Sequence, residues 1–375
     1  MSAPTGTLTP IGITRARKFP TGIAFTKGTN PIKHAPTSAV TANQEVPFKS
    51  VGVFTIDGLT GALTQVGGSP FPVTGMPSAV AVDPSGKFVH VASQISNTLS
   101  VYSMNSASGA LSPLQTSPYG TSSFPSSVAI DPSGRFVYVA NSSASTITAF
   151  TRNEDSGILA QIAGSPYATG GASSVTVDPA GQFALVTNAS SNSVTAFAID
   201  PVTGALTKIL PTLSESGHGA VSAAVDTSGR FVYVANASLN SVSAYSIDGR
   251  SGVLTSVAGS PYPAGTVPLS VTVDPIGQFV YVANETSKDI SALLRDPLSG
   301  GLIPIAGSPF AAGPNPDSVT VDLSSQFVYA GNGNPPLTIS GYGLNPATGG
   351  LTPLPGTPFS APGRTESITT IGVIQ

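Results

Sequence analysis

The chain has 375 residues, of which 9% are charged, and it carries a formal net charge of −3 at pH 7. Because Lys and Arg form no cluster and no apolar run reaches the length of a membrane span, we expect neither a nucleic-acid partner nor membrane insertion. Cysteine is absent, so disulfides and thiolate metal sites are excluded.

The first stretch of the chain departs most from the pattern that follows. Residues 1–19 are predicted to be an N-terminal closing segment, in which residues 7–10 resemble a stray outer strand. Residues 20–25 and 51–54 then resemble the first and third strands of a degenerate repeat unit.

From there a unit of about 48 residues repeats. Its most regular mark is Asp-Pro-Ser-Gly-x-Phe, at residues 83–88 and 131–136, and variants of it begin at Asp178, Asp226, Asp274 and Asp322. A steady period carried by short strand patterns indicates a radial or linear repeat architecture rather than independent domains.

One unit, residues 126–167, predicts four short antiparallel strands. Alternating or apolar runs at 127–130, 136–140, 145–150 and 158–162 are separated by turn residues such as Asp131 to Gly134. Four strands per unit without a helix are typical of a propeller blade. Equivalent apolar positions of the second and fourth strands should form the core; they are Phe88, Phe136, Phe183, Phe231, Phe279 and Phe327, with Leu63, Leu111, Leu159, Leu206, Leu254, Leu302 and Leu351.

The chain is therefore predicted to be one all-β domain over residues 1–375, a seven-bladed β-propeller of four-stranded antiparallel blades. Residues 364–375 provide a C-terminal closing strand, because end strands can complete a blade and remove an exposed sheet edge. Eight blades, the last with two strands, is the alternative. We expect a monomer.

The run Asp-Pro-Ser-Gly-Arg-Phe-Val-Tyr-Val-Ala-Asn at 131–141 has near-copies at 229–236 and 277–284, and Asp-Pro-Val-Thr-Gly-Ala-Leu-Thr occupies 200–207. These motifs resemble the lactonase-type seven-bladed β-propellers, which include 6-phosphogluconolactonase-like proteins. They are also similar to surface propellers with Tyr-Val-Thr-Asn-type repeats, which are regarded as binding scaffolds. The resemblance covers residues 20–375 and implies either lactone hydrolysis or binding.

The lactone-hydrolysing members of this family share a histidine near the position five residues before the blade aspartate. In this chain that position holds Ser78, Ser126, Ser173, Val221, Leu269 and Asp317, and the end units have Thr21 and Glu366 there.

Charged residues that break the repeat are the best guide to a site, because the repeat itself explains the others. They are predicted to lie on one face, around the channel mouth: Arg15, Arg17, Lys18, Glu45, Lys49, Glu215, His218, Glu285, Lys288, Asp289, Asp317, Arg364 and Glu366.

Asp317 and Glu366 occupy equivalent positions and should lie on neighbouring inner strands. Two close carboxylates can separate each other's pKa values and divide the roles of acid and base. Arg364, two residues from Glu366, is a candidate substrate-binding residue. An ion-pair cluster that only closes the ring is the alternative interpretation.

His218, between two glycines, is a candidate proton shuttle, with a solvated loop histidine as the alternative. Arg15 and Arg17 are further candidates for binding an anionic substrate or an oxyanion. His34 and His90 are expected to be structural. Because the three histidines are scattered and no Asp-x-Asp loop suits calcium, we expect no metal and no cofactor.

Two hypotheses follow. In the first, Asp317 or Glu366 activates water to hydrolyse a small-molecule lactone. In the second, a non-catalytic propeller binds a carbohydrate or a protein through loops that end at Asn43, Asn141, Asn188, Asn236, Asn284 and Asn332. The compartment stays open: low charge and a Ser/Thr-rich surface favour a periplasmic or secreted protein, and a cytoplasmic one is the alternative.

Overall fold

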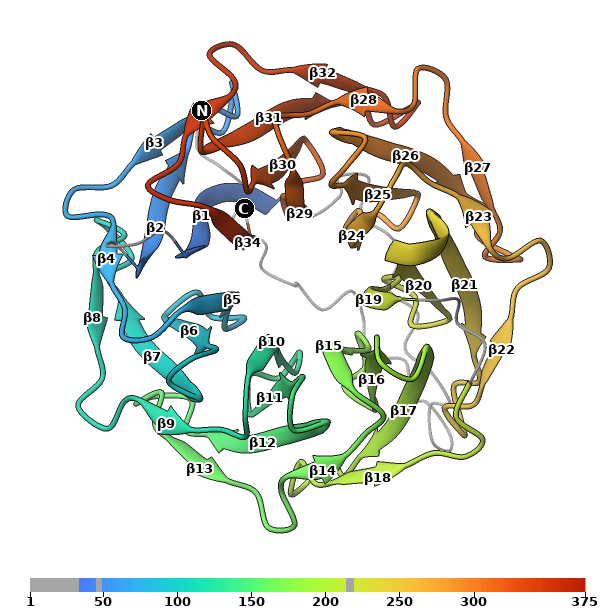
Figure 1. The fold of residues 1–375 in the computed structure, drawn as a ribbon. Coiled ribbons are helices and arrows are strands. Elements are labelled where there is room, and N and C mark those ends of the chain that lie inside the picture. The colour runs from blue at the N-terminus through green and yellow to red at the C-terminus, as the bar shows by residue number, and fades with distance from the viewer. Residues whose placement is uncertain (1–33, 45–48, 214–218, 375) are drawn as a thin grey trace, which may run out of the picture. The chain divides into compact units, whose positions relative to one another are not determined.

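The computed structural model describes residues 34–44, 49–213 and 219–374, and in these residues seven small antiparallel sheets form a ring (Figure 1). We call the sheets blades and number them in chain order, with the blade that joins both ends of the described chain as blade 7. The predicted seven-bladed propeller is thus confirmed, and the eight-bladed alternative is not observed.

The strands of blades 1 to 3 are as follows. Blade 1 contains β5 (Pro77–Val82), β6 (Phe88–Ser93), β7 (Thr98–Met104), β8 (Leu111–Pro113) and β9 (Tyr119–Gly120). Blade 2 contains β10 (Pro125–Ile130), β11 (Phe136–Asn141), β12 (Thr146–Arg152), β13 (Leu159–Gln161) and β14 (Tyr167–Ala168). Blade 3 contains β15 (Ala172–Val177), β16 (Phe183–Asn188), β17 (Ser193–Ile199) and β18 (Leu206–Lys208).

The remaining strands complete the ring. Blade 4 contains β19 (Ala220–Val225), β20 (Phe231–Asn236), β21 (Ser241–Ile247), β22 (Leu254–Ser256) and β23 (Tyr262–Pro263), with the short 3₁₀ helix η1 (Ala237–Leu239). Blade 5 contains β24 (Pro268–Val273), β25 (Phe279–Asn284), β26 (Asp289–Arg295), β27 (Leu302–Pro304) and β28 (Phe310–Ala311). Blade 6 contains β29 (Pro316–Val321), β30 (Phe327–Asn332), β31 (Thr338–Leu344), β32 (Leu351–Pro353) and β33 (Phe359–Ser360). Blade 7 contains β34 (Thr365–Ile374), β1 (His34–Gln44), β2 (Lys49–Ile56), β3 (Leu63–Gln65) and β4 (Phe71–Pro72).

The repeated aspartate fixes the turn between the first two strands of a blade. In blade 2 the Asp131 carboxylate accepts hydrogen bonds from the backbone N–H of Ser133 at 3.1 Å and of Phe136 at 2.6 Å. The turn glycine, Gly134, has a φ of 75°, which favours a residue without a Cβ. The motif that reveals the repeat is therefore a structural turn.

Six blades have a fifth strand that the sequence pattern does not predict. A Gly-Ser-Pro-aromatic corner, residues 164–167 in blade 2, folds back onto the third strand of the blade, so that Tyr167 of β14 pairs with Ile147 of β12. The corner serine is part of this contact, because Ser165 Oγ accepts a hydrogen bond from Ala149 N at 2.9 Å. The hydroxyl bond recurs in five other blades, which explains why the corner repeats.

The aromatic residues of the second strand join each blade to the next. Phe136 lies against Gly204 of blade 3 so closely that a Cβ on this glycine would meet the ring at 2.3 Å. Two residues along, Tyr138 donates its hydroxyl to the Gly204 carbonyl oxygen at 2.9 Å. The equivalent tyrosines of blades 4, 5 and 6 make the same bond. All six predicted phenylalanines are buried, and Leu63 is the one predicted leucine that is only partly buried.

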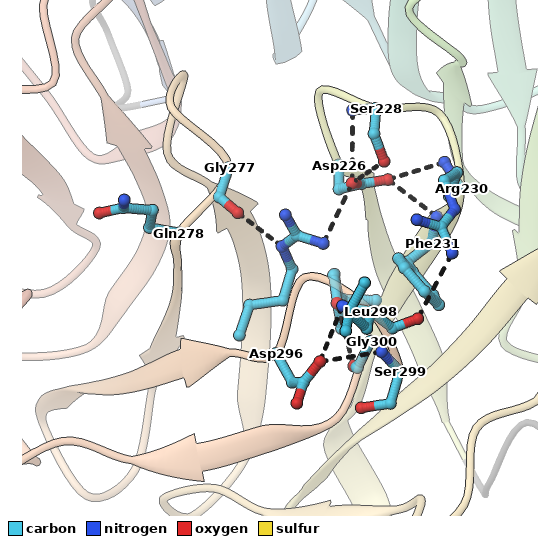
Figure 2. A network of polar contacts seen from close by, with 12 residues as sticks. Asp226, Ser228, Arg230, Phe231, Gly277, Gln278, Asp296, Leu298, Ser299 and Gly300 are labelled. Carbon is cyan, nitrogen blue, oxygen red and sulfur yellow. Dashed lines mark hydrogen bonds and ion pairs between the residues drawn. The ribbon is translucent and has the colours of Figure 1, made fainter.

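Buried ion pairs reinforce two of the junctions. Between blades 4 and 5, Arg295 contacts Asp226 at 3.3 Å and donates from Nε to the carbonyl oxygen of Gly277. Figure 2 shows the surrounding polar network, with Asp226 and Gly277 labelled. Between blades 1 and 2, Arg152 contacts Asp83 in the same way, also at 3.3 Å. A buried pair of this kind is costly to break, because the remaining partner is left as an uncompensated charge.

The ring closes in blade 7, where the two ends of the described chain share one sheet. The C-terminal strand β34 takes the innermost position and pairs antiparallel with β1 (Figure 1). The sequence analysis gave residues 20–25 as the first strand of a degenerate unit; these residues, like all of 1–33, lie outside the described residues. The closing role of residues 1–19 stays a prediction.

Within the described part of the chain, no helix is long and apolar enough to cross a lipid bilayer.

Candidate functional site

Two carboxylates lie at the junction where the ring closes. Asp317 is the second residue of β29, the inner strand of blade 6, and Glu366 is the second residue of β34, the inner strand of blade 7. In blades 1, 2 and 3 this position holds a serine, such as Ser126, whose hydroxyl donates to the carbonyl oxygen of Ser173 in the next blade at 2.9 Å. A small hydroxyl that joins blades is thus replaced by an acid at two adjacent positions.

Arg364 bridges the two acids. Its Nη2 lies 3.5 Å from Asp317 Oδ2, and its Nε lies 2.7 Å from Glu366 Oε1. The Asp317 side chain is only 5% exposed, whereas the Arg364 side chain is 46% exposed. The arginine therefore links a buried acid to solvent and presents donors that a solute can reach.

A glycine makes room for this contact. A Cβ on Gly333 would lie 1.9 Å from Asp317 Oδ2 and 3.2 Å from Arg364 Nε. Any side chain at this position would displace the Asp317 carboxylate from its ion pair. The sequence analysis missed this residue, although the corresponding positions after Asn141, Asn188 and Asn236 hold Ser or Ala and make Gly333 visible as a deviation.

The surroundings bring Asp317 close to half-ionised at neutral pH. Burial, and next the negative charge of Glu366, raise the pKa of Asp317 from 3.8 to about 7, against the opposing effect of Arg364. Burial also raises the pKa of Glu366, and Arg364 counteracts this. Asp317 Oδ1 is buried and has no hydrogen-bond partner among the described residues, so its capacity to accept a hydrogen bond is unused there.

A third carboxylate, Glu285, extends the cluster from blade 5. Its negative charge contributes to the raised pKa values of both Asp317 and Glu366. Asn315 Nδ2 donates to Glu285 Oε1 at 3.1 Å, which holds the glutamate near the start of β29. The sequence analysis placed Glu285 among the irregular charges but did not group it with the pair.

The other predicted site residues do not join this cluster in the described structure. Arg15, Arg17 and His218, together with Lys18, Glu45 and Glu215, lie outside the described residues. Asp289 makes a different contact, because its Oδ1 accepts a hydrogen bond from Asn284 Nδ2 of its own blade at 2.7 Å.

The asparagines that mark the loops of the binding hypothesis are themselves buried, and binding by the adjoining loops stays a prediction. Asn141, for example, is fully inaccessible and donates to Thr148 Oγ1 at 3.0 Å. The same burial holds for Asn43, Asn188, Asn236, Asn284 and Asn332. Asn141, Asn188, Asn236, Asn284 and Asn332 each donate to a hydroxyl of the third strand, and none of the six asparagines is exposed to a ligand.

His90 lies in the core of its blade, as expected, but its polar ring is poorly satisfied there. It replaces the repeated tyrosine in β6 and is fully buried, and neither ring nitrogen makes a well-formed hydrogen bond to the part of the chain that the structure describes. Burial lowers the pKa of His90 to about 3, so the ring is neutral. Among the residues that the structure describes, no group of three or more His, Cys, Asp or Glu residues could hold a metal ion.

A comparison with known protein families matches residues 37–124, 116–214 and 208–309 to one described as lactonase, 7-bladed beta-propeller. The chain belongs to this lactonase family. The matched residues cover blades 1 to 4 and most of blades 5 and 7, and they stop short of Asp317, Arg364 and Glu366. A search of curated proteins found no match.

Solved structures of similar fold include other lactonase-type propellers. A candidate 6-phosphogluconolactonase from Bacteroides uniformis has a TM-score of 0.78 at 20% identity, over 90% of this chain and 100% of that one. Another from Bacteroides fragilis has a TM-score of 0.78 at 18% identity, over 90% and 98% of the two chains. A periplasmic gluconolactonase from Pseudomonas aeruginosa has a TM-score of 0.74 at 18% identity, over 90% and 99%. At these identities the likeness shows the shared fold.

Proposed function

We propose that this lactonase-family propeller hydrolyses a sugar lactone at the cluster of Asp317, Arg364 and Glu366, on the face around the channel mouth. The observation that carries the proposal is a buried aspartate with a pKa of about 7 and an unpartnered oxygen, held beside a half-exposed arginine. A general base works best when its pKa lies near the operating pH. Family membership and the lactonase names of similar structures support the same reaction class.

In the proposed reaction, ionised Asp317 accepts a proton through Oδ1 from a water molecule, and the water oxygen attacks the lactone carbonyl carbon. The Arg364 guanidinium donates hydrogen bonds to the carbonyl oxygen as negative charge develops on it. The ring C–O bond then breaks, and protonated Asp317 returns its proton to the leaving alkoxide. The product is an open-chain hydroxy acid, and the enzyme is restored.

Glu366 has a different role in this scheme. Its ion pair of 2.7 Å with Arg364 Nε orients the guanidinium, and its charge helps to keep the pKa of Asp317 near neutrality. His218 as a proton shuttle and Arg15 and Arg17 as further groups that bind the developing oxyanion remain part of the proposal on sequence grounds.

The test is hydrolysis of sugar lactones by the wild type and by Asp317→Ala and Glu366→Ala variants, after subtraction of the spontaneous rate. We expect Asp317→Ala to lower kcat at least 100-fold, in the range that loss of a general base costs. Asp155→Ala, which removes an exposed acid in an outer turn of blade 2, is the matched control and should keep full activity. No activity in the wild type, or full activity in both site variants, would refute the proposal.

A pH profile adds a second readout. Since the base must be ionised, the rate should rise with pH through about 7 and level off above it. A rate that falls as pH rises through 7 would instead indicate that the protonated carboxyl is required.

A further inference from the structure

The described charges around Asp317 are predominantly negative. Three carboxylates, those of Asp317, Glu366 and Glu285, stand against the single guanidinium of Arg364. When all three acids are ionised, these four groups carry a formal charge of −2. A phosphorylated substrate would bring further negative charge into this field.

Glu285 is the member of the cluster that the proposed reaction does not use. It follows Asn284 at the end of β25, where the equivalent positions in blades 2, 3 and 4 hold Ser142, Ala189 and Ala237. An acid here is therefore not required by the blade itself.

The structure nevertheless holds Glu285 in a defined place. Asn315 donates to Glu285 Oε1 at 3.1 Å, and the Asn315 carbonyl oxygen accepts a hydrogen bond from Gly333 N at 2.7 Å. Asn315 has a φ of 52°, a left-handed conformation that asparagine tolerates better than most residues. Glu285 is thus tied to the loop before β29 and to the glycine that touches Asp317.

A second observation indicates that the cluster faces a ligand rather than only another blade. Asp317 is more than nine-tenths buried, and its Oδ1 has no partner among the described residues. An unsatisfied buried acceptor is costly unless something with an O–H or N–H occupies the space beside it. The hydroxyl groups of a sugar supply such donors, and a phosphate on that sugar would add only acceptors and negative charge.

We infer that Glu285 is a specificity-determining residue that makes this site select uncharged sugar lactones over phosphorylated ones. The inference rests on the proposed lactone hydrolysis and defines its substrate class. Glu285 repels an anionic substituent, while Arg364 is engaged by Asp317 and Glu366 and offers the carbonyl oxygen only its remaining donors.

The experiment compares kcat/KM for D-glucono-1,5-lactone and for its 6-phosphate at low and high ionic strength. The wild type should prefer the uncharged lactone, and Glu285→Gln should raise the relative kcat/KM for the phosphorylated one about sixfold. This value corresponds to one charge acting on a doubly charged phosphate at a distance of about 8 Å in the dielectric of water. The gain should shrink in high salt, because screening weakens the repulsion.

Two variants separate charge from structure. Glu285→Asp keeps the negative charge and should keep the selectivity of the wild type. Glu154→Gln makes the same chemical change at an exposed position in an outer turn of blade 2 and should leave kcat/KM unchanged for both substrates. A structural role for Glu285 would instead lower kcat/KM for both lactones together.

The possible failures are distinguishable. If the wild type hydrolyses the phosphorylated lactone as well as or better than the uncharged one, or if Glu285→Gln leaves the ratio unchanged, the inference is overturned and lactone hydrolysis stands. If the wild type hydrolyses neither lactone, the proposed function fails and the inference falls with it.

Discussion

Replacing Asp317 by asparagine should stabilise the fold at neutral pH while it removes the proposed activity. The pKa of Asp317 is raised from 3.8 to about 7, so the folded protein binds a proton more tightly there than the unfolded chain does. Stability is therefore fully present below pH 3.8 and is lost as pH rises toward 7, where the buried carboxyl must ionise. Asparagine has a similar shape and carries no such penalty.

The size of the effect follows from the pKa change. Each pKa unit corresponds to about 1.36 kcal/mol, so the rise from 3.8 to about 7 sets an upper bound of about 4 kcal/mol. Water penetration and relaxation reduce such values, and we expect Asp317→Asn to gain about 2 kcal/mol or more relative to the wild type between pH 4 and pH 8.

Urea unfolding of both proteins at a series of pH values between 4 and 8 measures this difference directly. Asp155→Asn, at an exposed outer turn, is the control and should follow the wild type at every pH. If the stability of Asp317→Asn and of the wild type changes in parallel with pH, Asp317 does not ionise in a buried environment, and its assignment as the base loses its physical ground.

Three further predictions concern the same contacts. Arg364→Gln removes a positive charge 3.5 Å from Asp317 Oδ2, an interaction worth about 1.2 kcal/mol in the dielectric of water, which is appropriate because Arg364 is half exposed. The midpoint of the rise of the rate with pH should therefore increase by about 0.9 pH. An unchanged midpoint would contradict the contact. Gly333→Ala should displace the Asp317 carboxylate and lower kcat at least tenfold with a small loss of stability, and unchanged kinetics would show that the site tolerates the methyl group. His90→Tyr should stabilise the protein by about 1 kcal/mol in thermal unfolding, because it restores the repeated interblade hydrogen bond. The reverse change, Tyr233→His, should destabilise it. If both variants change the stability by the same amount and in the same direction, the packing argument is refuted.

The fold was largely predictable because the same physical problem is solved repeatedly along the chain. The aspartate turn, the apolar second strand and the outer turn have similar residues in each unit. The pattern of residues 126–167 therefore predicted the ends of β10 to β13 to within about two residues. The fifth strands were missed because two residues such as Tyr167 and Ala168 carry no periodicity, and only the serine contact places them. The closure in blade 7 was harder to predict, because β34 and β1 are more than 300 residues apart in the chain and a local pattern does not show which distant strand it pairs with.

The candidate site was predictable only in part. Departure from the repeat identified Asp317, Glu366 and Arg364, and the structure brings these three together. Gly333 was overlooked because its importance lies in an absent side chain, and Glu285 was not grouped with the pair because its neighbours come from different blades. The asparagines were misread because a polar residue at a loop suggests exposure, whereas these side chains satisfy buried backbone and hydroxyl groups.

The closing strand β34 gives the proposed site a property that a site within one blade would lack. Asp317 is contributed by blade 6, while Glu366 lies on β34 and Arg364 directly before it, and β34 pairs with β1 more than 300 residues earlier in the chain. The constellation therefore cannot exist in a nascent or opened chain, because its members meet only when the two ends of the sheet are joined. Lactone hydrolysis would then require a closed ring, and a molecule from which β34 has been removed should have no activity on any lactone.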